Sequence, residues 1–256
     1  MPATPYEQSQ QFVTAGDIRF HYSLDGDPSK PTLALINMAS ANLTVWENTL
    51  DDLLETFQIL RFDIRGTGKS GWGDIDDFTF AQYADDLSAI MTTLKIPKAF
   101  VLGVAYGART AAQFAIRHHQ QLTGLALFDV ALTPPVEQTG QRELGDQARE
   151  MLAKAGEPLY PSQKYWRFYE DRDACLSAHT AHPRGPDTPK LLKHLTVRVL
   201  VAGGRQDMNL GEAERIAKAT PGATFTIMEM TGHGSPMFRP ALFAEIVKRF
   251  QTEHIQ

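Results

Sequence analysis

Three positions far apart in the chain could act together in chemistry, and one of them holds an unreactive residue. A strand that turns sharply into a helix is predicted for VLGVAYGART, residues 101–110, where Gly103 and Gly107 lie two residues on either side of Ala105. In a G-x-S-x-G turn of this kind, a serine nucleophile stands at the centre. Because the methyl group of Ala105 cannot attack a carbonyl carbon, any catalysis here needs another reacting group.

The other two positions supply an acid and a base. Asp207 ends an apolar run in VAGGRQDMNL, and His233 follows another in MEMTGHGSP. A carboxylate that orients an imidazole also stabilises its charged form, so the histidine can take up and return a proton. Asp129, which ends an apolar run in LALFDVAL, is a second candidate for the acid, and the G-x-x-D context favours Asp207.

These residues follow segments that we expect to be strands of one sheet. The segments are mostly continuous apolar runs with amphipathic stretches between them, which is typical of parallel strands covered by helices on both faces. The alternation predicts an α/β fold with a mostly parallel, doubly wound sheet and right-handed crossovers. Ligands bind at the carboxyl ends of such strands, where the candidate residues lie. The expected strands are 32–39, 58–65, 99–105, 124–131, 197–204 and 223–230.

The beginning of the chain follows a different pattern. Residues 11–26, QFVTAGDIRFHYSLDG, alternate between apolar and polar side chains, which favours an antiparallel hairpin. The turn is expected at Ala15 and Gly16, and the hairpin is expected at an edge of the sheet.

A long segment without a clear strand separates the fourth and fifth of these runs. From this interruption we expect residues 132–196 to be a helical insertion in a core formed by residues 1–131 and 197–256. Two helices are expected in the insertion, at 140–156 and 162–181. Its aromatic side chains could either line a pocket from above or bury the insertion against its own helices. These aromatic residues are Tyr165, Trp166, Phe168 and Tyr169.

Length and composition limit the classes of function. The chain has 256 residues, 43% hydrophobic and 21% charged, which suits one large globular domain. A net charge of −5 gives no basic field for nucleic acid or an anionic membrane. No basic stretch precedes an apolar run at the amino terminus, and no apolar run approaches about 18 residues, so we expect a cytoplasmic protein that acts on a small molecule. A homodimer fits the sequence, but no feature selects it.

Signals for cofactors, metals and disulfides are missing from the sequence. No G-x-G-x-x-G stretch lies between a predicted strand and a helix, so no dinucleotide site is expected. The histidines outside the candidate site show no metal-like pairing with nearby carboxylates. Cys175 is the single cysteine and cannot form an internal disulfide. We therefore expect neither a metal nor an organic cofactor.

The order of elbow, acid and histidine resembles the α/β-hydrolase family over essentially the whole chain. RFDIRGTGKSG, residues 61–71, resembles the D-x-R-G-x-G-x-S loop of that family, and 132–196 lies where those enzymes carry a helical cap. Within the family, INMASANLTVW is most similar to the 3-oxoadipate enol-lactonases, whose asparagine corresponds to Asn37. Met38 and Ser40 depart from the N-S-L-G run of those lactonases.

The resemblance implies a fold and roles for individual residues. It implies an α/β-hydrolase fold in which Asp207 orients His233 as general base and acid. The backbone N–H groups of Ala39 and Tyr106 would form an oxyanion hole that binds the developing negative charge. The residues that it places at a substrate pocket are Asn37, Met38, Ser40, Tyr165, Trp166 and Tyr169.

Three functions follow, and they differ in what Ala105 means. The first is a serine hydrolase of small esters or enol-lactones in which Ala105 is an engineered replacement, because loss of the serine oxygen typically costs about six orders of magnitude in kcat. The sequence does not distinguish an engineered alanine from a natural one, and the second hypothesis takes Ala105 as natural. The second is a serine-free lyase, isomerase or cyclase, C–C cleaving enzyme or cofactor-free oxygenase that uses Asp207 and His233 as a general base. The third is binding of a small molecule without turnover. We place the hydrolase first and the binder last.

Overall fold

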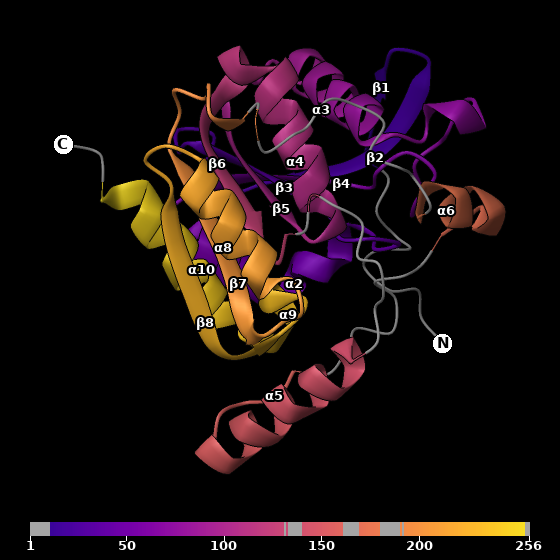
Figure 1. Cartoon of the computed structure of the whole chain (residues 1–256). Coiled ribbons are helices and arrows are strands. Elements are labelled where there is room, and N and C mark those ends of the chain that lie inside the picture. The colour runs from indigo at the N-terminus through magenta and orange to yellow at the C-terminus, as the bar shows by residue number, and fades with distance from the viewer. Residues whose placement is uncertain are drawn as a thin grey trace.

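In the computed structural model the described strands form one eight-stranded sheet in the order β1-β2-β4-β3-β5-β6-β7-β8 (Figure 1). The structure describes residues 11–130, 132, 140–160, 169–179, 190 and 192–253. The strands are β1 (Phe12–Ala15), β2 (Ile18–Asp25), β3 (Thr32–Ile36), β4 (Gln58–Phe62), β5 (Ala99–Val104), β6 (Leu122–Phe128), β7 (Val199–Gln206) and β8 (Thr224–Gly232). Pairing is antiparallel at β1–β2 and β2–β4 and parallel from β4 to β8.

The sequence prediction of a mostly parallel sheet is confirmed. The amino-terminal hairpin is also antiparallel and at the edge, but its turn is Gly16–Asp17, one residue later than expected, because Ala15 pairs with Ile18. The strand before the candidate acid Asp129 ends at Phe128, earlier than predicted. It ends there because Asp129 takes a left-handed conformation, with φ 52°, that breaks the extended backbone.

Helices cover both faces of the sheet, which is why its strands are apolar on both sides. On one face α3, α4 and α8 pack on the sheet, and on the other α2 and α10 do so. The described helices of this core are α2 (Glu47–Leu54), α3 (Phe80–Thr93), α4 (Tyr106–Arg117), α8 (Leu210–Ala219), α9 (Ser235–Phe238) and α10 (Pro240–Thr252). Short 3-10 helices lie at η1 (Leu43–Trp46), η2 (Ile75–Asp77) and η3 (His119–Gln121).

The described parts of residues 132–196 contain α5 (Gln141–Ala155) and α6 (Arg172–His179). α5 lies beside β7 and β8 and extends beyond the end of the sheet (Figure 1). The second predicted helix, 162–181, is wrong at Tyr169, which forms an isolated β-bridge with Gly68 before α6 begins. Tyr165 and Trp166 lie outside the described residues.

The turn from β5 into α4 depends on two glycines that allow backbones to meet. A Cβ atom on Gly103 would lie 2.2 Å from the carbonyl oxygen of Gly107. A Cβ atom on Gly107 would lie 2.3 Å from the carbonyl oxygen of Ile36 and 2.5 Å from that of Asn37. No side chain fits at such distances, so the two glycines fix how closely α4 approaches β5 and β3.

Replacing Gly107 by alanine should therefore destabilise the fold. The new methyl group would overlap backbone atoms, which cannot rotate away, and we expect a loss of about 3 kcal/mol or more in the free energy of unfolding. Urea unfolding followed by circular dichroism measures this loss. Gly211→Ala in α8 is the matched control, because nothing lies within 4 Å of its Cβ position; equal stability of the two variants would contradict the packing account.

Candidate active site

Ala105 occupies a strained elbow between β5 and α4. Its backbone has φ 54° and ψ −110°, a region that residues with a Cβ atom rarely adopt and that costs about 1–3 kcal/mol. Its N–H donates to the carbonyl oxygen of Phe128 at 2.8 Å, which ties the elbow to the end of β6. The elbow geometry is therefore retained although the residue at its tip carries no reactive atom.

The structure brings Asp207 and His233 together. Nδ1 of His233 lies 3.2 Å from Oδ1 and 3.1 Å from Oδ2 of Asp207, although the two residues are on the separate loops after β7 and β8. The Asp207 side chain is fully buried, whereas that of His233 is 33% exposed. A buried carboxylate thus holds one nitrogen of an imidazole that solvent or a small molecule can reach.

The surroundings of His233 favour its protonated form. Burial lowers the pKa of His233, but the hydrogen bond to Asp207 and the negative charges of Asp207 and Asp129 outweigh that effect. The net result is a pKa above the ordinary value of 6.5. A raised pKa makes the neutral imidazole a stronger base than a free histidine.

Asp129 lies beside this pair without contacting the imidazole. Its fully buried carboxylate accepts hydrogen bonds from the backbone N–H groups of Gly204, Gly234 and Ser235 and from the hydroxyl of Ser235. Burial and the charge of Asp207 raise the pKa of Asp129 to about 6. Of the two candidate acids, Asp207 therefore bonds to the histidine and Asp129 to the loop that carries it.

The loop after β3 contains Ala39, one of the two residues assigned to the oxyanion hole, and part of the expected pocket. The amide of Asn37 is buried: its Nδ2 donates to Phe62 O at 2.9 Å and to Ala41 O at 3.3 Å, and its Oδ1 accepts from Trp46 Nε1 at 2.7 Å. Asn37 therefore fixes the backbone course of this loop. Met38 is buried in the core, and Ser40 and Ala39 are half-buried, with Ser40 at φ 56°.

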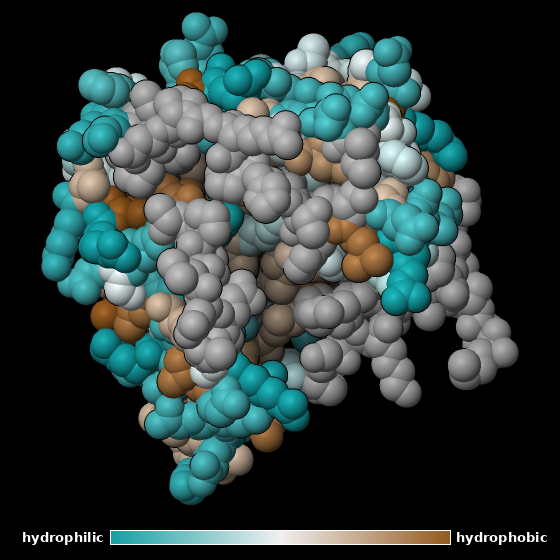
Figure 2. All heavy atoms as spheres, turned by 45° about the vertical axis from the view of Figure 1, so that its right-hand side comes forward, coloured by the Kyte–Doolittle hydropathy of each residue, from teal (hydrophilic) through white to brown (hydrophobic). Residues whose placement is uncertain are grey.

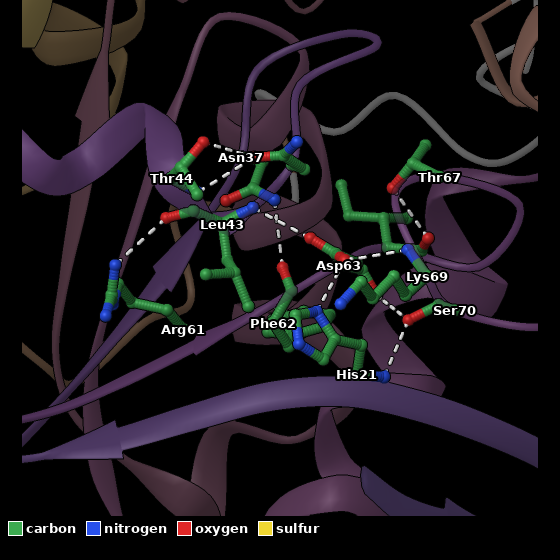
Figure 3. Close-up of polar contacts among 12 residues, drawn as sticks. His21, Asn37, Leu43, Thr44, Arg61, Phe62, Asp63, Thr67, Lys69 and Ser70 are labelled. Carbon is green, nitrogen blue, oxygen red and sulfur yellow. Dashed lines mark hydrogen bonds and ion pairs between the residues drawn. The ribbon is translucent and has the colours of Figure 1, made fainter. Parts of the chain in front are cut away.

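A second histidine–aspartate pair holds the neighbouring loop and is fully buried (Figure 3). Nδ1 of His21 lies 2.8 Å from Oδ2 of Asp63, which also accepts from the backbone N–H of Lys69. The other carboxylate oxygen accepts from the N–H of Leu43 at 2.7 Å. Asp63 thus joins the D-x-R-G-x-G-x-S loop to the loop after β3, and the sequence analysis missed this because His21 lies 42 residues away.

Tyr106 packs by its ring against α3. The ring centroids of Tyr106 and Phe80 are 4.6 Å apart and tilted edge to face, and Tyr83 lies next to both. Burial and the neighbouring Tyr106 raise the pKa of Tyr83 far above its ordinary value. The Tyr106 side chain is a packing element, while its backbone N–H stands in the first turn of α4, where helical N–H groups have no intrahelical acceptor.

Helix α5 touches both loops of the Asp207–His233 pair. Oε1 of Gln141 accepts from the backbone N–H of Met208 at 3.3 Å, directly after the acid. Gly145 packs against Gly232, the residue directly before His233. A Cβ atom added to Gly232 would lie 3.1 Å from the Cα of Gly145. Arg149 lies over the ring of Phe238 at 4.7 Å. Sequence reasoning missed Gln141, and no local signal marks it.

The segment around α6 contacts a different loop. Glu170 N–H donates to Gly68 O at 3.0 Å, and Nε1 of Trp72 donates to Asp171 at 3.2 Å. Tyr169 is therefore placed against the D-x-R-G-x-G-x-S loop by its bridge to Gly68. Within residues 132–196, the described piece with α5 and the described piece with α6 are anchored on different loops.

On the face drawn in Figure 2, hydrophilic and hydrophobic residues are interspersed, and the surface is hollowed near the centre of the view. Most large hydrophobic side chains exposed in the described ranges belong to residues 132–196 or to the acid loop. The exposed large hydrophobic residues are Trp72, which is the exception, and Met151, Leu159, Tyr160, Leu176 and Met208.

A search of the described residues finds no cluster of three or more His, Cys, Asp or Glu side chains that could hold a metal ion. Within the same ranges, none of the helices is long and apolar enough to cross a membrane.

Comparisons with known proteins show which proteins this chain is similar to. "Putative carbamate hydrolase RutD" of Caulobacter vibrioides is 27% identical over 254 residues, 90% of this chain and 94% of that protein. "3-oxoadipate enol-lactonase 2" of Acinetobacter baylyi is 24% identical over 46% of this chain and 44% of its own length. The crystal structure of the enol-lactonase from Burkholderia xenovorans LB400 shares the fold, with a TM-score of 0.75, 24% identity, and coverage of 94% of this chain and 100% of that one.

Residues 40–246 match the model of the Alpha/beta hydrolase family. That match spans well over half of the chain and includes the elbow, Asp207 and His233. The resemblance seen in the sequence is thereby confirmed, and this protein belongs to the α/β-hydrolase family.

Proposed function

We propose that this protein hydrolyses a small carboxylic ester or lactone, with His233 acting as general base on a water molecule. The observation that carries the proposal is the bond between a buried Asp207 and a partly exposed His233 in a chain whose elbow has no hydroxyl. An oriented imidazole of raised pKa serves proton transfer, whereas a site that only binds a ligand has no need of one.

The proposed reaction needs no covalent intermediate. His233 takes a proton from water as the water oxygen attacks the carbonyl carbon. The N–H groups of Ala39 and Tyr106 stabilise the resulting oxyanion, a type of contact worth about 10²–10³ in kcat for each donor. When the tetrahedral intermediate collapses, the bond to the leaving oxygen breaks and that oxygen receives the proton from His233. Ala105 leaves room for the water where a serine oxygen would stand.

The substrate class is supported by the names of the relatives. One is named a carbamate hydrolase and another an enol-lactonase, and both names describe cleavage of a bond between a carbonyl carbon and a heteroatom. These relatives are less than 30% identical to this chain, so the acyl group and the leaving group are part of the proposal.

A second candidate function rests on Ala105 itself. Without a nucleophile, His233 could take a proton from carbon beside a carbonyl, and the same N–H groups would stabilise an enolate. Lyase, isomerase or cyclase, C–C cleaving and cofactor-free oxygenase reactions all use a general base, and those that pass through a carbon-derived enolate begin with this step. Exchange of the substrate's α-hydrogen for deuterium in D₂O would reveal it.

Turnover of a panel of small esters and lactones tests the proposal. The panel is offered to the wild-type chain, to His233→Gln and to Ala105→Ser under identical conditions. We expect slow turnover by the wild type, loss of about 10³-fold or more in His233→Gln, and a large gain in Ala105→Ser, because the general base would then activate a serine.

Two results would contradict the proposal. Turnover by Ala105→Ser alone would identify a hydrolase scaffold that lacks its nucleophile and would exclude activation of water in the wild type. Inactivity of both the wild type and Ala105→Ser would exclude ester hydrolysis. Exchange of the α-hydrogen would then decide between the second candidate function and ligand binding.

The pH dependence follows from the environment of His233. Only the neutral imidazole can accept a proton, so kcat/KM should rise with pH through the pKa of His233 in the free enzyme. Because the charges of Asp207 and Asp129 outweigh burial, the rise should be centred above 6.5. Steady-state rates between pH 5 and 9, in buffers of constant ionic strength, measure this. A midpoint below 6.5 would contradict the electrostatic account.

A further inference from the structure

Asp129 is a buried carboxylate that the proposed reaction does not use. It follows β6, its side chain has no exposure, and its backbone φ of 52° is in the left-handed region. Burying a charge without partners is costly, so a carboxylate is retained at such a place only when its contacts compensate. Its contacts therefore indicate what it does.

Most of these contacts go to the loop that carries His233. The carboxylate oxygens accept from Gly234 N at 3.0 Å, from Ser235 N at 2.7 Å and from Ser235 Oγ at 2.7 Å. A fourth bond, at 3.3 Å, comes from Gly204 N on β7. Three of the four donors thus belong to the two residues directly after His233, and they converge on one side chain.

The backbone of Asp129 is joined to the other parts of the site. Asn209 bridges it to the acid, because Nδ2 of Asn209 donates to Asp129 O at 3.1 Å while its N–H donates to Asp207 Oδ1 at 2.9 Å. The preceding residue, Phe128, accepts the N–H of Ala105. Residue 129 is therefore linked to the elbow, the acid loop and the histidine loop.

We propose that Asp129 is a positioning residue, whose carboxylate holds the backbone of residues 234–235 so that the imidazole of His233 stays in contact with Asp207. The proposal rests on the proposed function for the claim that this contact matters to a reaction. A carboxylate suits the task because its two oxygens only accept hydrogen bonds, whereas an asparagine would turn an N–H₂ group toward N–H donors.

Asp129 also adds a negative charge near the imidazole. The charged groups that face His233 in the described residues are Asp207 on the loop after β7 and Asp129 after β6. Burial first, and then the charge of Asp207, raise the pKa of Asp129, whereas its four hydrogen-bond donors favour the charged carboxylate. Removing its charge should lower the pKa of His233.

The test is the titration of His233 in Asp129→Asn, followed by NMR of the imidazole Cε1–H signal in the full chain. The signal is assigned by its loss in His233→Gln. We expect the pKa of His233 to fall in Asp129→Asn, and kcat/KM to fall by about 10- to 100-fold, as expected for a misplaced catalytic group. Asp86→Asn is the matched control. Asp86 lies on α3, is also buried, and accepts two hydrogen bonds from the guanidinium of Arg65.

A role in folding alone gives a different result. If Asp129→Asn loses stability as Asp86→Asn does, while the titration of His233 stays at its wild-type position, the proposal is wrong. The NMR titration needs no turnover, so an unchanged pKa of His233 overturns the proposal even if no ester of the panel is hydrolysed and the proposed function fails.

A second experiment remains decisive if Asp129→Asn does not fold. In His233→Gln, the amide protons of Gly234 and Ser235 should still shift with pH as Asp129 takes up a proton, with a midpoint at or above 6, because the positive charge of the histidine is gone. Amide shifts that stay constant from pH 4 to 8 would show that the carboxylate does not hold this loop in solution.

Discussion

The site depends on a contact between backbones that leaves no room for side chains. Gly103 and Gly107 allow α4 to begin against the ends of β5 and β3, with the carbonyl oxygens of Ile36 and Asn37 where a Cβ atom would be. That closeness forces the sharp elbow and puts Ala105 in a strained conformation. In a G-x-S-x-G elbow this strained position is held by a nucleophilic serine, and here it is held by an alanine. The strained turn is thus kept in a chain whose elbow residue has no hydroxyl.

Around the elbow, buried polar contacts join loops that are distant in sequence. Asp63 binds the loop after β3 to the D-x-R-G-x-G-x-S loop, and Asp129 binds the end of β6 to the histidine loop. Helix α5 adds contacts at Met208 and Gly232, on either side of the Asp207–His233 pair. Loops tend to move, so a reaction that needs two side chains within about 3 Å requires such anchors.

The sequence was sufficient for the mostly parallel sheet and for the turn from β5 into α4, because continuous apolar runs and glycines report directly on local backbone. That Ala105, Asp207 and His233 form a catalytic site stays a prediction. The sequence could not predict that the Asn37 amide would donate to the carbonyl oxygen of Phe62 and accept from the indole N–H of Trp46, since both contacts depend on tertiary packing. The contacts of Asp129 with residues more than 70 positions away are of the same kind. The helix expected from 162 was wrong at Tyr169 because pairing with Gly68 overrides a local amphipathic pattern.

The central claim is that this chain cleaves a carbonyl compound through water activated by His233, with no bond to the protein. Intact-protein mass spectrometry, sampled within milliseconds to minutes of mixing with a turned-over ester, tests it most directly. The account predicts an unchanged mass for the wild type during turnover, and in Ala105→Ser a transient increase equal to the acyl group. An acyl adduct on the wild type would contradict the account, because it would reveal a nucleophile other than water.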